Sequence, residues 1–288
     1  YMGLVELYRV TGERRYLELA RVMIDNRGKA PGGTDLNQDH VPFRRESEAV
    51  GHAVFATYLY SGAADVYAEM QGRGLRRALD RVWTDVTTQN MLITGGVGAL
   101  RKGKSFRGDD VHEAFLEDYT LPERAAYSET CANIGNAMWN RRMLALTGKA
   151  RYADVMERVI YNSMLSAMSA EGDGFFYCNP LRWTGEKEGP SMHHTATRWK
   201  TRFCFCCPVQ VARTIASLQT WAYSVSENAV WVHLYGGSRL QTNLPDGTPV
   251  KLTQETDYPW KGDVRLRLEE GPERKMALRL RIPGWTDA

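Results

Sequence analysis

Apolar residues recur at spacings of three and four along residues 1 to about 225, which predicts a succession of amphipathic helices. Two of these helices end at a Thr-Gly pair, at Gly12 and Gly148, and each following helix restarts at a basic residue followed by tyrosine. Glycine often ends a helix, so these positions predict antiparallel helical hairpins. The clearest helical patterns cover residues 16–26, 48–67, 77–89, 132–148, 150–169 and 208–225.

From about residue 229 the pattern changes to short segments in which apolar and polar residues alternate, which predicts β-strands. Turn residues, such as those at 245–248, separate these segments. The predicted fold class is therefore mainly α, with a helical domain over residues 1–225 and a β-domain over residues 226–288. The strand patterns cover residues 229–241, 249–258, 263–271 and 275–285.

Three long polar loops interrupt the helical pattern, at residues 26–43, 93–115 and 177–208. Long loops on a rigid helical scaffold commonly carry functional residues, so we expect the site among them. The glycines between residues 95 and 98 do not join a strand to a helix. We therefore interpret them as a turn rather than a dinucleotide-binding loop.

The composition is that of an ordinary soluble globular protein, with 288 residues of which 43% are hydrophobic and 25% charged. The net charge is +3, and the only dense basic run, residues 73–77, is interpreted as a solvated helix face. Nucleic-acid binding is therefore not expected. No apolar run approaches the roughly 20 residues needed to cross a bilayer, so no membrane span is expected.

The five cysteines form an odd set that is crowded near two loops, which favours reduced thiols and a cytoplasmic location over a secreted disulfide framework. Cys178 and Cys204 are interpreted as structural residues. The helical pattern is already present in the first turn, at Tyr1, so we expect the true start of the protein to precede it.

Two short segments combine three cysteines with a carboxylate. Glu129 and Cys131 lie in "YSETCAN", and Cys206 and Cys207 lie in "CFCCPVQ". This composition suits a zinc site, or a cysteine nucleophile beside a metal ion. The spacing is not that of a zinc ribbon, so the alternative that these cysteines are small apolar residues stays open.

Both segments are predicted to lie where a helix begins. Ser128 suits the N-cap of a helix beginning near Glu129, with Cys131 in the first turn. Pro208 suits a first helical position, which places Cys206 and Cys207 on the loop entering that helix. Two facing helix N-termini would favour negative charge and hold the carboxylate and thiolates together.

Several stretches together resemble glycoside hydrolase family 127, the β-L-arabinofuranosidases. The resemblance implies a six-hairpin α/α toroid followed by β-sandwich domains. About seven of the family's twelve toroid helices are visible here, so the resemblance implies a partial toroid without its N-terminal helices and a shortened β-domain. The stretches are "VPFRRESEAVGHAVFATYLYSGAADV", "HEAFLEDYTLPERAAYSETCA", "FFYCNPL", "CCP" and "LRIPGW".

The resemblance also implies a role for each member of the two cysteine segments. Glu129, Cys131, Cys206 and Cys207 would bind Zn²⁺, and Cys206 would attack the anomeric carbon of the sugar. Glu113 in "HEAF" would be the general acid/base of a retaining hydrolase. On composition alone, Glu113 would instead be an exposed carboxylate at the start of a helix.

The same resemblance implies that three further residues contact the sugar: His52, Tyr177 and, as a weaker candidate, Glu157. Their alternative interpretations are a core histidine, a packed aromatic side chain and a surface charge, respectively. His193 and His194 receive no role from the resemblance and are interpreted as solvated.

The partner implied is an oligosaccharide or small molecule containing L-arabinofuranose. One alternative is a zinc-stabilised helical module that binds carbohydrate, or a fragment without catalysis. Another is a different hydrolase or an epimerase on a similar toroid, which would not need three sulfurs. An edge strand of the β-domain could also pair with a second copy to give a homodimer.

Overall fold

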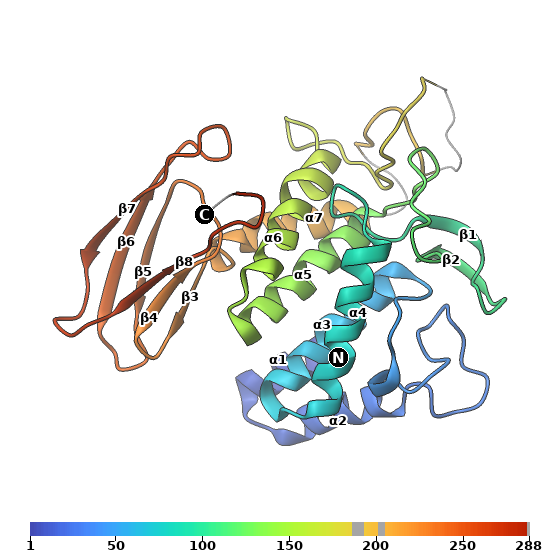
Figure 1. The fold of residues 1–288 in the computed structure, drawn as a ribbon, viewed down its shortest axis with the longest axis horizontal. Coiled ribbons are helices and arrows are strands. Elements are labelled where there is room, and N and C mark those ends of the chain that lie inside the picture. The colour runs from blue at the N-terminus through green and yellow to red at the C-terminus, as the bar shows by residue number, and fades with distance from the viewer. Residues whose placement is uncertain (186–192, 201–204, 287–288) are drawn as a thin grey trace.

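The computed structural model describes residues 1–185, 193–200 and 205–286, and within these ranges seven α-helices precede a small β-domain (Figure 1). Short 3₁₀ and π segments extend or connect the helices at Phe43–Arg45, Val86–Asn90, Ile160–Met164, Leu165–Ala167 and Leu218–Thr220. The helices are α1 (Met2–Thr11), α2 (Arg14–Asn26), α3 (Ala53–Met70), α4 (Arg73–Asp85), α5 (Thr130–Thr147), α6 (Ala150–Val159) and α7 (Cys206–Ser217).

The predicted glycine stops join α1 to α2 and α5 to α6. Gly12 and Gly148 adopt left-handed backbone conformations, with φ of 73° and 65°. Their N–H groups donate to the carbonyl oxygens of Tyr8 and Leu144, which satisfies helix ends that would otherwise lack partners. The prediction of helical hairpins at these two positions is confirmed.

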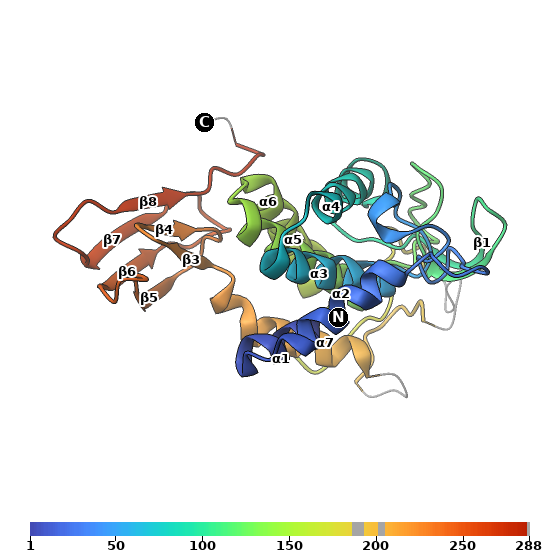
Figure 2. The ribbon, with the colours of Figure 1, turned by 90° about the horizontal axis from the view of Figure 1, so that it is seen from below.

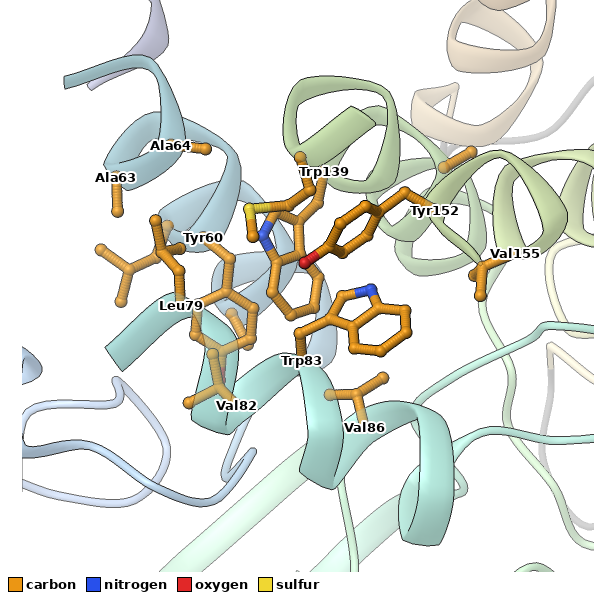
Figure 3. Packing of buried hydrophobic residues seen from close by; sticks show 14 of the residues in the cluster. Tyr60, Ala63, Ala64, Leu79, Val82, Trp83, Val86, Trp139, Tyr152 and Val155 are labelled. Carbon is orange, nitrogen blue, oxygen red and sulfur yellow. The ribbon is translucent and has the colours of Figure 1, made fainter. Parts of the chain in front are cut away.

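The main core lies between α3, α4, α5 and α6, and Figure 3 shows its large aromatic side chains meeting there. Tyr60 and Trp139 are fully buried, with ring centroids 4.8 Å apart. Trp83 packs on Tyr152 at 4.8 Å and donates its indole hydrogen to Oδ1 of Asn140 at 2.8 Å. Burying aromatic side chains of this size stabilises the fold by roughly 2 kcal/mol each.

The strands of the β-domain form two three-stranded sheets beside α6, with orders β3-β4-β8 and β5-β6-β7 (Figures 1 and 2). The β4–β8 pair is parallel and the other pairs are antiparallel. Buried Val230 and Val232 of β4 share one core with Val250 and Leu252 of β6, so the sheets pack face to face. The strands are β3 (Tyr223–Ser226), β4 (Ala229–Val232), β5 (Ser238–Asn243), β6 (Pro249–Glu255), β7 (Arg265–Glu270) and β8 (Ala277–Leu280).

The two parts of the chain meet at α6. Arg281, just after β8, donates to Asp154 at 2.8 Å and to Glu157, both on α6. A Cβ atom at Gly148 would lie 2.8 Å from the ring of Trp231, so this turn needs glycine for its close approach as well as its conformation. The β-domain is therefore fixed to the last helical hairpin by packing and by charge.

Several predicted element boundaries are wrong. Residues 48–52 are not helical because Gly51 has φ of 67° and lies against the carbonyl of Asp35, so α3 begins at Ala53. Part of the loop predicted at 93–115 is a hairpin of β1 (Leu100–Lys104) and β2 (Asp110–Ala114). At the other end, β3 begins at Tyr223, inside the segment predicted as helical.

No helix in the described ranges combines the length and the apolar character needed to cross a membrane.

Candidate active site

Four side chains from the starts of two helices meet in a thiol–carboxylate cluster, formed by Glu129, Cys131, Cys206 and Cys207. Glu129 is the N-cap of α5, and Cys206 and Cys207 are the first two residues of α7, which packs on α5. Cys207 Sγ lies 3.6 Å from Cys131 Sγ and 3.7 Å from Cys206 Sγ. Glu129 Oε1 lies 3.7 Å from Cys206 Sγ, and all four candidate ligand atoms lie within 4.8 Å of one another.

Burial makes the carboxylate of this cluster costly to ionise without a cation nearby. Glu129 is only 3% exposed, and burial, with the nearby charges of Glu113 and Cys206, raises its pKa to about 9. Hydrogen bonds with Cys131 and Cys206, together with burial, likewise raise the pKa of Cys207. Glu129 Oε2 is buried and has no hydrogen-bond partner among the residues that the structure describes. A bound cation would supply that partner, so these residues fit a metal ion.

The three sulfurs of the cluster differ in their access to solvent. Cys131 and Cys207 are 3% and 1% exposed, whereas Cys206 is exposed. Cys206 is also the first residue of α7, where the helix dipole favours a negatively charged sulfur. Within the cluster, Cys206 is therefore the cysteine most accessible from solvent.

Glu113 lies on β2 and receives a hydrogen-bond partner at each carboxylate oxygen. The hydroxyl of Tyr127 donates to Oε1 at 2.6 Å, and Nε2 of His52 lies 3.0 Å from Oε2. Burial alone would raise the pKa of Glu113, but the hydrogen bonds with His52 and Tyr127 prevail and lower it to about 2. In this arrangement Glu113 is held as a carboxylate.

An aromatic group connects Glu113 to the cluster. Tyr127 and Tyr177 are buried together with Cys131 and Cys207. Burial raises the pKa of Tyr127, so its hydroxyl keeps its proton and acts as the donor to Glu113. The two tyrosine rings lie 5.9 Å apart, centroid to centroid. The candidate acid/base and the thiol–carboxylate cluster are thus parts of one site.

Comparison with known proteins identifies the family. The chain matches the family model described as "Beta-L-arabinofuranosidase, GH127 catalytic domain" over residues 1–220, and that of the GH127 middle domain over residues 229–288. The chain belongs to glycoside hydrolase family 127. The resemblance recognised from the sequence motifs is confirmed.

Three known proteins illustrate the similarity. A non-reducing end β-L-arabinofuranosidase of Bifidobacterium longum subsp. longum is 30% identical, with 99% of this chain and 46% of the relative covered. A solved structure described as a glycoside hydrolase has a TM-score of 0.95 and 44% identity, covering 100% of this chain and 49% of the other. A GH127 β-L-arabinofuranosidase from Geobacillus stearothermophilus T6 has a TM-score of 0.90 and 41% identity, covering 100% and 47%. The chain therefore spans about half the length of these relatives.

Two details of the family 127 cluster differ from the sequence prediction. Cys206 and Cys207 lie within the first turn of α7 rather than on a loop before it, and Glu129 rather than Ser128 is the N-cap of α5. Pro208 is the third residue of α7, a position that it tolerates because N–H groups in a first helical turn have no intrahelical partner. Cys204 lies outside the described residues.

Glu157, predicted as a weaker candidate for sugar contact, lies away from the thiol–carboxylate cluster and from Glu113 in the described part of the chain. It is 5% exposed and lies at the contact between α6 and the β-domain. Its Oε1 accepts hydrogen bonds from Arg281 and, at 3.0 Å, from Tyr258, and its Oε2 accepts from Trp285 at 3.4 Å. The alternative interpretation of Glu157 as a surface charge is wrong, because both of its oxygens are bound inside the protein.

Sequence reasoning missed three aromatic and histidine side chains around the site. Tyr127 belongs to a motif that was recognised but was given no role. The interpretation of His194 as solvated is wrong, since it is 3% exposed with Nε2 at 3.0 Å from the carbonyl of Ala126. His193 stacks on Tyr177 with centroids 4.4 Å apart. His193 and His194 lie in the long loop at 177–208, which was expected to carry functional residues, but no motif or periodicity within it singled out either histidine.

Proposed function

We propose that this chain carries the active site of a retaining glycoside hydrolase that removes β-L-arabinofuranosyl residues from non-reducing ends. Membership of family 127 and similarity to β-L-arabinofuranosidases support the reaction class. The observation that carries the residue assignment is that Cys206 is the exposed cysteine of a cluster whose other two cysteines are buried. The helical hairpins are, in this proposal, part of a six-hairpin α/α toroid.

Glu129, Cys131, Cys206 and Cys207 would hold Zn²⁺, whose ligands in proteins are thiolates, imidazoles and carboxylates. When bound, zinc would keep the sulfur atoms deprotonated and fixed in position. Oε2 of Glu129, buried and without a hydrogen-bond partner within the described ranges, supports this assignment, because a buried carboxylate needs a compensating positive charge.

Cys206 is the proposed nucleophile and Glu113 the proposed acid/base. The sulfur of Cys206 attacks the anomeric carbon as the bond to the leaving oxygen breaks, and Glu113 gives that oxygen a proton. In the second step Glu113 takes a proton from water, the water oxygen attacks the same carbon, and the carbon–sulfur bond breaks. Two inversions at one carbon give net retention of configuration.

The hydrogen bonds around Glu113 suit the second step directly, because they favour the carboxylate that accepts the proton from water. The first step needs Glu113 protonated. We therefore propose that the bound sugar displaces His52 or Tyr127 from Glu113, which removes a contact that holds its pKa low. In this proposal His52 and Tyr177 contact the bound sugar, and their nearness to Glu113 and to the thiol–carboxylate cluster supports this.

The test is zinc content and hydrolysis of a synthetic β-L-arabinofuranoside, measured for the wild type, Cys206→Ser and Cys178→Ser. Cys178 is 2% exposed and its sulfur is outside the thiol–carboxylate cluster, so its variant controls for loss of a buried thiol. We expect Cys206→Ser to abolish turnover and Cys178→Ser to keep both zinc and turnover. Turnover that persists in Cys206→Ser would eliminate Cys206 as the nucleophile.

A second candidate function is a zinc-stabilised carbohydrate-binding module without catalysis. The observation favouring it is that the chain spans about half the length of its relatives. Saturable binding of an arabinofuranoside to the zinc-loaded, folded chain, without any hydrolysis, would support this function over the first.

A further inference from the structure

His52, His112 and Glu113 form a second group of candidate metal ligands, separate from the thiol–carboxylate cluster. One ligand atom from each lies within 4.8 Å of the other two. Nε2 of His52 is 3.0 Å from Oε2 of Glu113, and the rings of His52 and His112 are 5.3 Å apart and nearly perpendicular. His52 is buried and His112 is exposed, so the group reaches the surface.

The backbone at Glu113 brings the two neighbouring side chains of β2 together. In a regular strand, consecutive side chains point to opposite faces. Glu113 instead has φ of 50°, a left-handed conformation that is unusual for a residue other than glycine. His52 comes from outside the hairpin, because its backbone forms an isolated antiparallel bridge with Ala114. One distorted strand position therefore assembles all three side chains.

Two imidazoles and one carboxylate are a donor set that zinc enzymes use while leaving a fourth position open. Tyr127 occupies Oε1 of Glu113, which leaves Oε2 toward His52 as the oxygen that can bind a cation. Ligands bound tetrahedrally at zinc distances lie about 3.3 Å from one another. The His112 side chain is exposed, so the core does not hold its ring in one position.

We propose that His52, His112 and Glu113 bind a second divalent transition-metal ion, more weakly than the thiol–carboxylate cluster, and that its binding inhibits hydrolysis. It is weaker because it offers three nitrogen and oxygen ligands, one of them on a solvent-exposed side chain, against a carboxylate and three thiolates. It inhibits because Glu113 cannot exchange protons while Oε2 is bound to a metal. The inhibition rests on the proposed function, whereas the binding does not.

The binding is tested by equilibrium dialysis of the whole chain against increasing Zn²⁺, with bound metal counted per chain. Wild type should bind two ions and His112→Ala one. Lys102→Ala is the matched control, because Lys102 pairs with His112 across the hairpin and is also exposed, and this variant should bind two. A single ion in the wild type, or two in His112→Ala at the same zinc concentration, would overturn the second site.

Cobalt identifies which ion belongs to which group. Co²⁺ at the thiol–carboxylate cluster should give an intense sulfur-to-metal absorption band, and the second equivalent should add only weak bands. His112→Ala should keep the first band and lose the second spectral change. A sulfur band that grows with both equivalents would place the second ion on the cysteines and contradict the assignment to His112.

The inhibition is tested by measuring arabinofuranoside hydrolysis against free zinc. In wild type, turnover should rise as the cluster fills and then fall as the second site fills. In His112→Ala the rise should remain, and the inhibition constant should weaken by at least about tenfold, the smallest effect expected for disturbing a metal site. Identical inhibition in both proteins would overturn the regulatory role. If no protein turns over at any zinc concentration, the proposed function fails while the metal count still decides the second site.

Discussion

The hydroxyl of Tyr127 donates a 2.6 Å hydrogen bond to Oε1 of Glu113. The bond joins the loop before α5 to strand β2, and the tyrosine ring is buried in one cluster with Cys131. Tyr127 therefore positions the candidate acid/base relative to the cysteine cluster. It also favours the ionised form of Glu113, because a donor to a carboxylate stabilises its negative charge.

Tyr127→Phe should raise the pKa of Glu113, since it removes one of the two hydrogen bonds that lower this pKa to about 2. The ring packing is kept. The limb of the pH profile of kcat/KM that reports ionisation of Glu113 should then move to higher pH. Tyr152→Phe is the control, since its hydroxyl lies near Asp80 and Arg151 in the core and should leave the profile unchanged. Identical profiles for wild type and Tyr127→Phe would show that this bond does not tune Glu113.

Removal of zinc should lower the thermal stability of the chain. An ion that binds the folded state alone stabilises it by about 2.7 kcal/mol when its concentration is a hundred times Kd. Cys131→Ser should lose most of the zinc-dependent rise in Tm, and Cys178→Ser should keep it. The Tm of each protein, measured by calorimetry with excess zinc and with chelator, checks this. An equal rise in Cys131→Ser would remove Cys131 from the ligand set.

Zinc affinity should also fall as the pH is lowered. Without metal, the pKa of Glu129 is raised to about 9, and a metal ion has to displace its proton and those of the thiols. Zinc titrations at pH 8 and pH 6 should show weaker binding at pH 6, with protons released on binding. Affinity that does not depend on pH would mean that these groups are not the ligands.

The sequence predicted the features that depend on local signals. Gly12 and Gly148 end helices because glycine takes up the left-handed conformation that the turns require. Glu129 and Cys131 lie two residues apart at the start of a helix. Their side chains lie close to those of Cys206 and Cys207, as expected for a shared metal site. Neighbouring residues and a helix boundary were sufficient for these predictions.

Features that depend on distant residues were not predictable in this way. The β1–β2 hairpin is exposed and rich in charge, with Arg101, Lys102 and Lys104 on β1, so it lacks the apolar alternation by which strands are recognised. Nothing in the sequence shows that Glu113 takes a positive φ. The role of Glu157 depends on Arg281, which is 124 residues away in the chain.

Arg281→Met should destabilise the chain by about 3–5 kcal/mol, because it leaves Glu157 buried without its cation. The side chains of Arg281 and Glu157 are 2% and 7% exposed. The double variant Arg281→Met with Glu157→Gln should recover part of this loss. Urea unfolding of both single variants and of the double variant measures these free energies of unfolding. If the loss in the double variant equals the sum of the two single losses, the pair is not coupled.

Glu157→Gln alone separates the structural role of Glu157 from a contact with the sugar. Because both of its oxygens are bound by Arg281, Tyr258 and Trp285, we expect a loss of stability with an unchanged KM for an arabinofuranoside. A higher KM at unchanged stability would instead support the sugar contact that the family motif implied.

His233 should make the stability of the β-domain depend on pH. It is 6% exposed, with Nε2 at 2.7 Å from the hydroxyl of Ser224, and burial together with the charges of Arg281 and Arg141 lowers its pKa from 6.5 to about 4. Because the folded-state pKa is the lower one, the stabilisation is complete above pH 6.5 and is lost as the pH falls toward 4. The free energy of unfolding should decrease by about 2 kcal/mol between pH 7 and pH 5 from this residue alone.

In His233→Gln that part of the decrease should disappear, as measured by urea unfolding at both pH values. An equally large decrease in the variant would assign the pH dependence to other groups.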